Sequence, residues 1–240
     1  MSQHSLYGGK VILDFNEKRH LYTISGRPIR SVTGISEPKP ALLYWAAKMA
    51  SEHILANLKP GVALDEIEIA SLAEGAKKAH SGIAGKAADI GTLAHAACEG
   101  FVKSGGVDHT PVNIQARASY LQFVEWYKTH KVEIHASEAK VYHLDHDYCG
   151  TLDLDATVDG IRCIVDVKTS NAVYLGMHCQ VAAYTKARGR ELGVEYGPGW
   201  ILRLPKDGAG FEAKKIDDIE QAFGAFLGLK EWYDYEGRNK

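Results

Sequence analysis

Two alternating runs joined by an Asp-Gly pair constrain the fold of this chain most strongly. They are residues 151–158, Thr-Leu-Asp-Leu-Asp-Ala-Thr-Val, and residues 161–168, Ile-Arg-Cys-Ile-Val-Asp-Val-Lys. Asp159-Gly160 between them is typical of a two-residue type I′ turn, because glycine accepts the positive φ that this turn requires. The pattern therefore predicts a β-hairpin in which Val158 pairs with Ile161.

This register predicts which side chains share a face of the hairpin, because side chains alternate along each strand. One face is expected to be apolar throughout, with Leu152, Leu154, Ala156, Val158, Ile161, Cys163, Val165 and Val167. The same count places Asp153 opposite Asp166 on the other face, with Lys168 beside them. Because directly opposed like charges destabilise paired strands, a divalent cation between the carboxylates is expected. The alternative is an ordinary solvent-facing side of a hairpin.

Four short motifs occur in order along the chain. Gly150-Thr151-Leu152-Asp153 and Asp166-Val167-Lys168 resemble the signature of the PD-(D/E)xK nuclease superfamily, in which an acid on one strand and an acid-x-Lys on the next bind metal. Gly91-Thr92-x-x-His95 and Gln180-x-x-x-Tyr184 are similar to its RecB-like branch, which includes phage exonucleases. The N-terminal segment resembles phage members through Phe15, His20-x-Tyr22, Gly26, Ser31-Val32-Thr33 and Trp45.

The resemblance implies a metal site for one or two Mg²⁺ or Mn²⁺ ions, whose preference for oxygen ligands suits carboxylates. The implied ligands are His95, Asp153, Asp166 and the backbone carbonyl of Val167. Without the resemblance, a single histidine on an alanine-rich helix face is more often a packed or hydrogen-bonded core residue than a ligand. Glu99, one turn after His95, is expected either to orient the site through a hydrogen bond or to face solvent.

The catalytic residues implied by the resemblance are Asp153, Asp166, Lys168, Glu138, Gln180 and Tyr184. Lys168 lies two residues beyond Asp166 and so on the same strand face, where its ammonium would orient the attacking water. Glu138 matches an acid next to the site, and an exposed strand glutamate is the alternative. Gln180 and Tyr184 share a helix face at i and i+4. Their alternative is a core tyrosine with a buried amide partner.

Strand and helix patterns alternate along the rest of the chain. Strands are expected near residues 11–15, 21–24, 132–142, 200–204 and 211–216, and helices near residues 45–58, 65–80, 113–130 and 217–235. Gly82 and Gly85 are expected to end the second helix before another begins near Lys86, and residues 169–171 offer an N-cap for a helix to about residue 192. This order predicts an α/β fold with a mixed sheet.

The resemblance makes that fold more specific. It implies a restriction-endonuclease-like core over residues 85–240, with a central mixed β-sheet flanked by helices. Residues 1–84 would form an N-terminal hairpin and mostly helical lobe of the same domain. A chain of 240 residues with 45% hydrophobic content is long enough for one substantial core.

The implied function is a divalent-metal-dependent DNA exonuclease, with a phage recombination protein as a further partner. A structure-specific endonuclease and a noncatalytic nucleic-acid-binding module remain alternatives. The net charge of −2 is unusual for binding nucleic acid, although local clusters of lysine and arginine can hold a phosphate backbone. No apolar run approaches the ~20 residues that span a bilayer, so the chain is expected to avoid the membrane and reside in the cytoplasm.

The cysteines exclude some metal centres and leave another open. Cys98, Cys149, Cys163 and Cys179 are scattered, and no cysteine follows the last of them. An iron–sulfur cluster of the kind found in some RecB-like nucleases is therefore not expected. The compact spacing of His143, His146 and Cys149 permits a zinc-binding module, but no fourth ligand is evident. A P-loop kinase or ATPase is excluded because no G-x-x-x-x-G-K-[ST] occurs.

Overall fold

The computed structural model describes residues 1–36 and 41–239. The chain divides into two compact units, one formed by Met1–Glu37 together with Leu93–Lys240 and the other by Pro38–Thr92. The first unit is therefore discontinuous in sequence, and the second is inserted between its two parts. The expected boundary between residues 84 and 85 falls inside one helix, α3 (Glu66–Lys103).

The second unit contains α2 (Ala41–Asn57) and the first part of α3. A capping box begins α3, because the Asp65 carboxylate accepts from the Glu68 N–H while the Glu68 carboxylate accepts from the Asp65 N–H. The expected interruption at Gly82 and Gly85 is wrong, since α3 runs through both. A helical glycine costs only about 1 kcal/mol relative to alanine, which a long helix tolerates.

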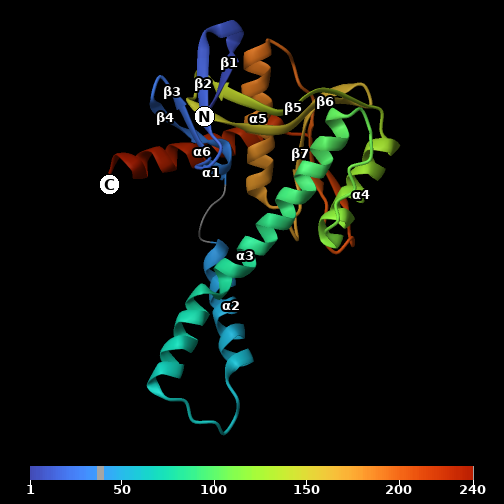
Figure 1. The fold of residues 1–240 in the computed structure, drawn as a ribbon. Helices are drawn as coiled ribbons and strands as arrows, with labels where there is room; N and C mark the ends of the chain where they lie inside the picture. The colour runs from blue at the N-terminus through green and yellow to red at the C-terminus, as the bar shows by residue number, and fades with distance from the viewer. Residues whose placement is uncertain (37–40, 240) are drawn as a thin grey trace. The chain divides into compact units, whose positions relative to one another are not determined.

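A mixed sheet of nine strands forms the first unit (Figure 1). The strands are β1 (Ser2–Leu6), β2 (Val11–Asn16), β3 (Leu21–Ile24), β4 (Arg27–Ser31), β5 (Val132–His143), β6 (Tyr148–Val158), β7 (Ile161–Lys168), β8 (Gly199–Arg203) and β9 (Glu212–Ile216). Their order is β1-β2-β3-β4-β6-β7-β8-β9, and β5 also pairs with β6. The β4–β6 and β7–β8 pairs are parallel and the others antiparallel. The expected α/β fold with a mixed sheet is confirmed.

Strand β6 has three partners, and their positions create a fork. One edge of β6 pairs with β5 along its whole length, from Tyr148 to Val158. The opposite edge pairs first with β4, at Tyr148 and Cys149, and later with β7, from Leu154 to Val158. We call residues 150–153 of β6 the fork, because there β4 has ended and the regular β7 ladder has not begun. Asp153 is the last residue of the fork.

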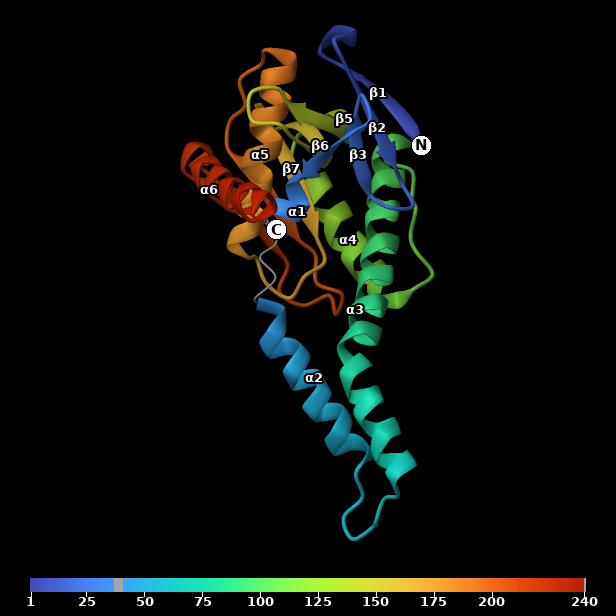
Figure 2. The same ribbon diagram turned by 90° about the vertical axis from the view of Figure 1, so that its left-hand side faces the viewer.

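Helices cover both faces of the sheet (Figure 2). The C-terminal part of α3 and α4 (Ile114–Thr129) pack on one face, where Phe101, Phe123 and Trp126 contact a cluster that includes Val165 and Leu202. The other face is covered by α1 (Val32–Ser36), α5 (Leu175–Leu192) and α6 (Ile219–Arg238). A short 3₁₀ turn, η1 (Tyr7–Gly9), links β1 to β2. Among the described residues, none of the helices combines the length and the apolar character needed to cross a bilayer.

Most local expectations are confirmed, but the start of α5 and two strands, β1 and β4, differ from them. The central hairpin has the expected register from Val158–Ile161 to Leu154–Val165. Helix α4 begins after Asn113, whose side chain accepts from two backbone N–H groups. Helix α5, in contrast, begins after Tyr174 rather than at residues 169–171. Strands β1 and β4 were not expected. Pro28 in β4 has no N–H for a ladder, and β4 pairs with β6 only through Arg30 and Ser31.

Candidate metal centre

The regular alternation of side chains fails at the fork. Leu154 belongs to the core on the α4 face, whereas Leu152 packs with Ile164 in the core on the α5 face. Asp153 lines a small cavity together with Leu154 and Val167. The expectation that Leu152 and Leu154 share a face is wrong. The physical reason is that β6 exchanges one neighbouring strand for another between Cys149 and Leu154.

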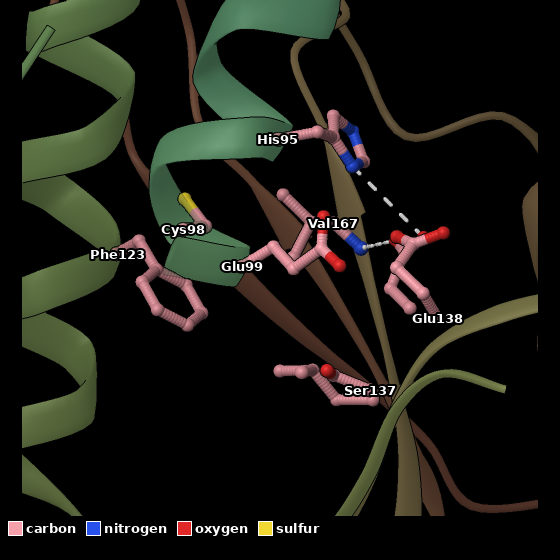
Figure 3. Close-up of a pocket in the computed structure, with 9 residues that line it drawn as sticks. His95, Cys98, Glu99, Phe123, Ser137, Glu138 and Val167 are labelled. Carbon is pink, nitrogen blue, oxygen red and sulfur yellow. Dashed lines mark hydrogen bonds and ion pairs between the residues drawn. The ribbon is translucent and has the colours of Figure 1, made fainter. Parts of the chain in front are cut away.

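Three side chains with metal-ligating atoms converge at this point. His95 comes from α3, Glu138 from β5 and Asp153 from the fork, and one donor atom of each lies within 4.8 Å of the others. His95 Nδ1 is 3.9 Å from Asp153 Oδ1. The Val167 N–H donates to Asp153 Oδ2 at 2.6 Å, which holds the carboxylate against β7. Figure 3 shows His95 on its helix and Glu138 on its strand at this point, with dashed lines that begin at His95 and at Val167.

The cavity between these residues is small. Its volume is about 10 Å³, close to the minimum that holds one water-sized species. Its walls are His95, Cys98, Glu99, Phe123, Ser137, Glu138, Asp153, Leu154 and Val167. A space of this size, lined by three carboxylates and an imidazole, suits a single ion better than an organic ligand.

Glu138 is held in an unusual backbone conformation. Its φ of +52° lies in the left-handed region, which a non-glycine residue adopts only when its surroundings enforce it. The neighbouring residues Ser137 and Ala139 remain in register with Leu154 and Leu152. Glu138 therefore faces the fork residue Asp153 across the β5–β6 pair. Strain of this kind concentrates at functional sites.

Negative charge is crowded in the centre. Burial, with smaller contributions from the charges of Asp153 and Glu99, raises the pKa of the Glu138 carboxyl from 4.5 to about 7. Burial, with a smaller contribution from Asp153, also raises the pKa of the Cys98 thiol, which stays protonated at neutral pH. The Glu99 carboxylate accepts a hydrogen bond from Lys103, one turn further along α3. A cation bound among these groups would relieve their mutual repulsion.

Asp166 and Lys168 form an ion pair beside the centre. Lys168 Nζ is 2.6 Å from Asp166 Oδ2, and the Asp166 side chain is only 1% exposed. Asp166 is not part of the three-residue group, whose two carboxylates are those of Asp153 and Glu138. The structure thus brings together the expected ligands His95 and Asp153, and places Val167 beside them through its N–H rather than its carbonyl.

Gln180 and Tyr184 form a buried hydrogen-bonded pair on α5. Gln180 Nε2 donates to Tyr184 Oη at 3.3 Å and to Thr33 Oγ1 at 3.1 Å. Burial raises the pKa of the Tyr184 phenol, and the negative charge of Asp166 adds to this effect. Helix α5 therefore places the tyrosine within electrostatic reach of Asp166. Sequence reasoning missed Thr33, whose only signal was its position in the Ser31-Val32-Thr33 motif.

The alternative zinc ligands are not brought together. The rings of His143 and His146 lie 4.8 Å apart and pack against Phe223. The Cys149 thiol is turned toward β4 and donates to the carbonyl of Arg30 at 3.4 Å. All four cysteines are free and buried.

The chain matches no protein-family model and no curated protein sequence.

Proposed function

We propose that this chain is a divalent-metal-dependent DNA exonuclease of the PD-(D/E)xK superfamily, with a restriction-endonuclease-like core of the RecB-like branch. It would act in the cytoplasm on phage or prophage DNA. One observation carries the proposal. His95, Glu138 and Asp153 converge on a cavity of ionic size, directly beside a strand that ends in Asp166-Val167-Lys168.

The donor set fits Mg²⁺ or Mn²⁺. Two carboxylates and one imidazole within 4.8 Å of one another provide hard oxygen ligands and a nitrogen ligand that Mn²⁺ accepts readily. Burial, together with the charges of Asp153 and Glu99, raises the pKa of Glu138, and a bound cation would favour its charged form. His95, Glu138 and Asp153 would hold the ion. When bound, such an ion polarises a phosphodiester and lowers the pKa of a water molecule.

Val167, Lys168 and Asp166 would position the groups around the ion. The Val167 N–H fixes one oxygen of Asp153, so the carboxylate presents its other oxygen toward His95. Lys168 carries a positive charge on the strand beside the centre, where it would orient the attacking water and stabilise charge on the phosphoryl oxygens. Asp166 holds the Lys168 ammonium at 2.6 Å and so positions it.

The test is a cleavage assay on DNA labelled at either end. Linear and circular substrates are incubated with purified protein in Mg²⁺, in Mn²⁺ or in a chelator. The proposal predicts metal-dependent loss of linear but not circular DNA. Cleavage of the circle would favour a structure-specific endonuclease, and binding without any metal-dependent cleavage would favour a noncatalytic nucleic-acid-binding module.

Lys168→Gln tests the assignment within the same assay. Glutamine keeps an N–H donor toward Asp166 but removes the charge, so the fold should be retained. The cleavage rate is expected to fall by about 10²-fold or more, the usual effect of removing one stabilising donor, while DNA binding in chelator is unchanged. Lys214→Ala, on the exposed part of β9, is the matched control and should cleave normally. Normal turnover by Lys168→Gln would remove Lys168 from the mechanism.

A further inference from the structure

The N-terminal strands contact the fork through a pair of aromatic rings. Phe15 of β2 and Tyr22 of β3 are cross-strand partners, and their rings are stacked with centroids 4.6 Å apart. Both residues are buried, with 5% and 3% of their surfaces exposed. We call Phe15 and Tyr22 the aromatic pair.

The aromatic pair engages β5 and β6 at one cross-strand position. Tyr22 Oη and Thr151 Oγ1 share a hydrogen bond of 2.8 Å. The Lys140 ammonium lies over the Phe15 ring, 4.7 Å from its centroid. Lys140 and Thr151 are themselves direct partners in the β5–β6 ladder. The two rings are therefore fixed to the two residues of one rung.

The carboxylates of the candidate metal centre lie close to this rung. Asp153 follows Thr151 by two residues, and Glu138 precedes Lys140 by two. The negative charge of Glu138 acts on the pKa values of both Lys140 and Tyr22, so this rung lies within electrostatic reach of the centre. Thr151 lies in the fork, where β6 lacks the regular support of β4 or β7 on one edge. The backbone that carries Asp153 is therefore held by β5 on one edge, and side-chain contacts such as that of Thr151 support it further.

We propose that Tyr22 is a positioning residue for the metal centre, which fixes the fork through Thr151 so that Asp153 and Glu138 meet at ion-binding distance. This inference rests on the proposed function, because it concerns the same centre. Burial raises the pKa of the Tyr22 phenol to about 12, so its hydroxyl remains neutral and able to hold this hydrogen bond at any working pH. Removing a residue that holds a metal ligand in place typically lowers metal affinity by about 10–100-fold.

The test measures Mn²⁺ affinity by isothermal titration calorimetry at pH 8, independently of nuclease activity. Tyr22→Phe and Thr151→Val each remove the hydrogen bond while preserving shape, and Thr151→Ser restores it. Both deletions are expected to weaken Mn²⁺ binding about 10-fold or more, and Thr151→Ser is expected to bind like the wild type. The double variant should bind no more weakly than either single variant, because the two groups form one interaction.

Tyr7→Phe is the matched control. The Tyr7 hydroxyl also donates a hydrogen bond from the N-terminal region to β5, to the Tyr142 carbonyl at 2.8 Å, but it does not contact the fork. Tyr7→Phe and Tyr22→Phe should lower the midpoint of thermal unfolding similarly, whereas only Tyr22→Phe should weaken Mn²⁺ binding. Wild-type affinity in both Tyr22→Phe and Thr151→Val would overturn the positioning role. Failure of the wild type to bind Mn²⁺ would overturn the metal centre itself.

Discussion

Replacing Glu138 with glutamine should stabilise the metal-free protein and abolish metal binding. The carboxyl of Glu138 is half-buried beside Asp153, and burial with neighbouring charge raises its pKa from 4.5 to about 7. Glutamine has nearly the same shape but no charge. The variant therefore removes the cost of ionising this group inside the protein without changing its packing.

The size of the effect follows from proton linkage. The folded protein binds a proton at Glu138 that the unfolded chain has lost between pH 4.5 and about 7, so the free energy of unfolding falls as the pH rises through this interval. A difference of about 2.5 pH units corresponds to ~3.4 kcal/mol at 1.36 kcal/mol per unit. Because the side chain is partly exposed, solvent screening reduces this to ~2 kcal/mol.

Urea denaturation in chelator, followed by the fluorescence of the four tryptophans, measures this difference. At pH 8 Glu138→Gln is expected to unfold with a free energy ~2 kcal/mol above that of the wild type, and at pH 4 the difference should vanish. Adding Mn²⁺ at pH 8 should stabilise the wild type only. Glu133→Gln, at an exposed position on the same strand, should change stability by less than about 0.5 kcal/mol. A Glu138→Gln variant less stable than the wild type at pH 8 would refute the argument.

Two further substitutions test the core of the fold. Asp155 is fully buried and its carboxylate binds both Arg162 and Arg188 at 2.9–3.1 Å, so Asp155→Ala should lower the free energy of unfolding by about 3–5 kcal/mol in urea; a loss below 1 kcal/mol would contradict this. A Cβ on Gly150 would lie 2.7 Å from Tyr184 Cε1, so Gly150→Ala should cost about 1–3 kcal/mol in thermal unfolding. Gly228→Ala, where a Cβ meets nothing within 4 Å, is the control and should not destabilise.

The sequence predicted the hairpin well because the hairpin is a local structure. The Asp159-Gly160 turn and the alternating pattern determine its register from Val158–Ile161 to Leu154–Val165. The pattern failed between Leu152 and Leu154, where a strand more than a hundred residues away in sequence, β4, replaces β7 along the edge of β6. The alternation of residues along β6 does not indicate that its partner strand changes from β4 to β7.

The candidate centre was predictable in its residues more than in its geometry. The family resemblance implied His95, Glu138 and Asp153, and the structure places these three together. It did not indicate that Asp166 would form an ion pair with Lys168. Nor did it indicate the left-handed backbone of Glu138, since local propensity disfavours that conformation for glutamate.

The pairing of Ser31 with Cys149 has a consequence for synthesis of the chain. These direct partners in the β4–β6 ladder are 118 positions apart in the sequence, the difference between residue numbers 149 and 31. At about 5–20 residues per second on the ribosome, β4 is synthesised ~6–24 s before its partner residue in β6. During that interval the newly made N-terminal strands carry an open hydrogen-bonding edge, which is the kind of surface that joins sheets of separate molecules. Rapid translation of residues 32–149 therefore favours correct folding over aggregation.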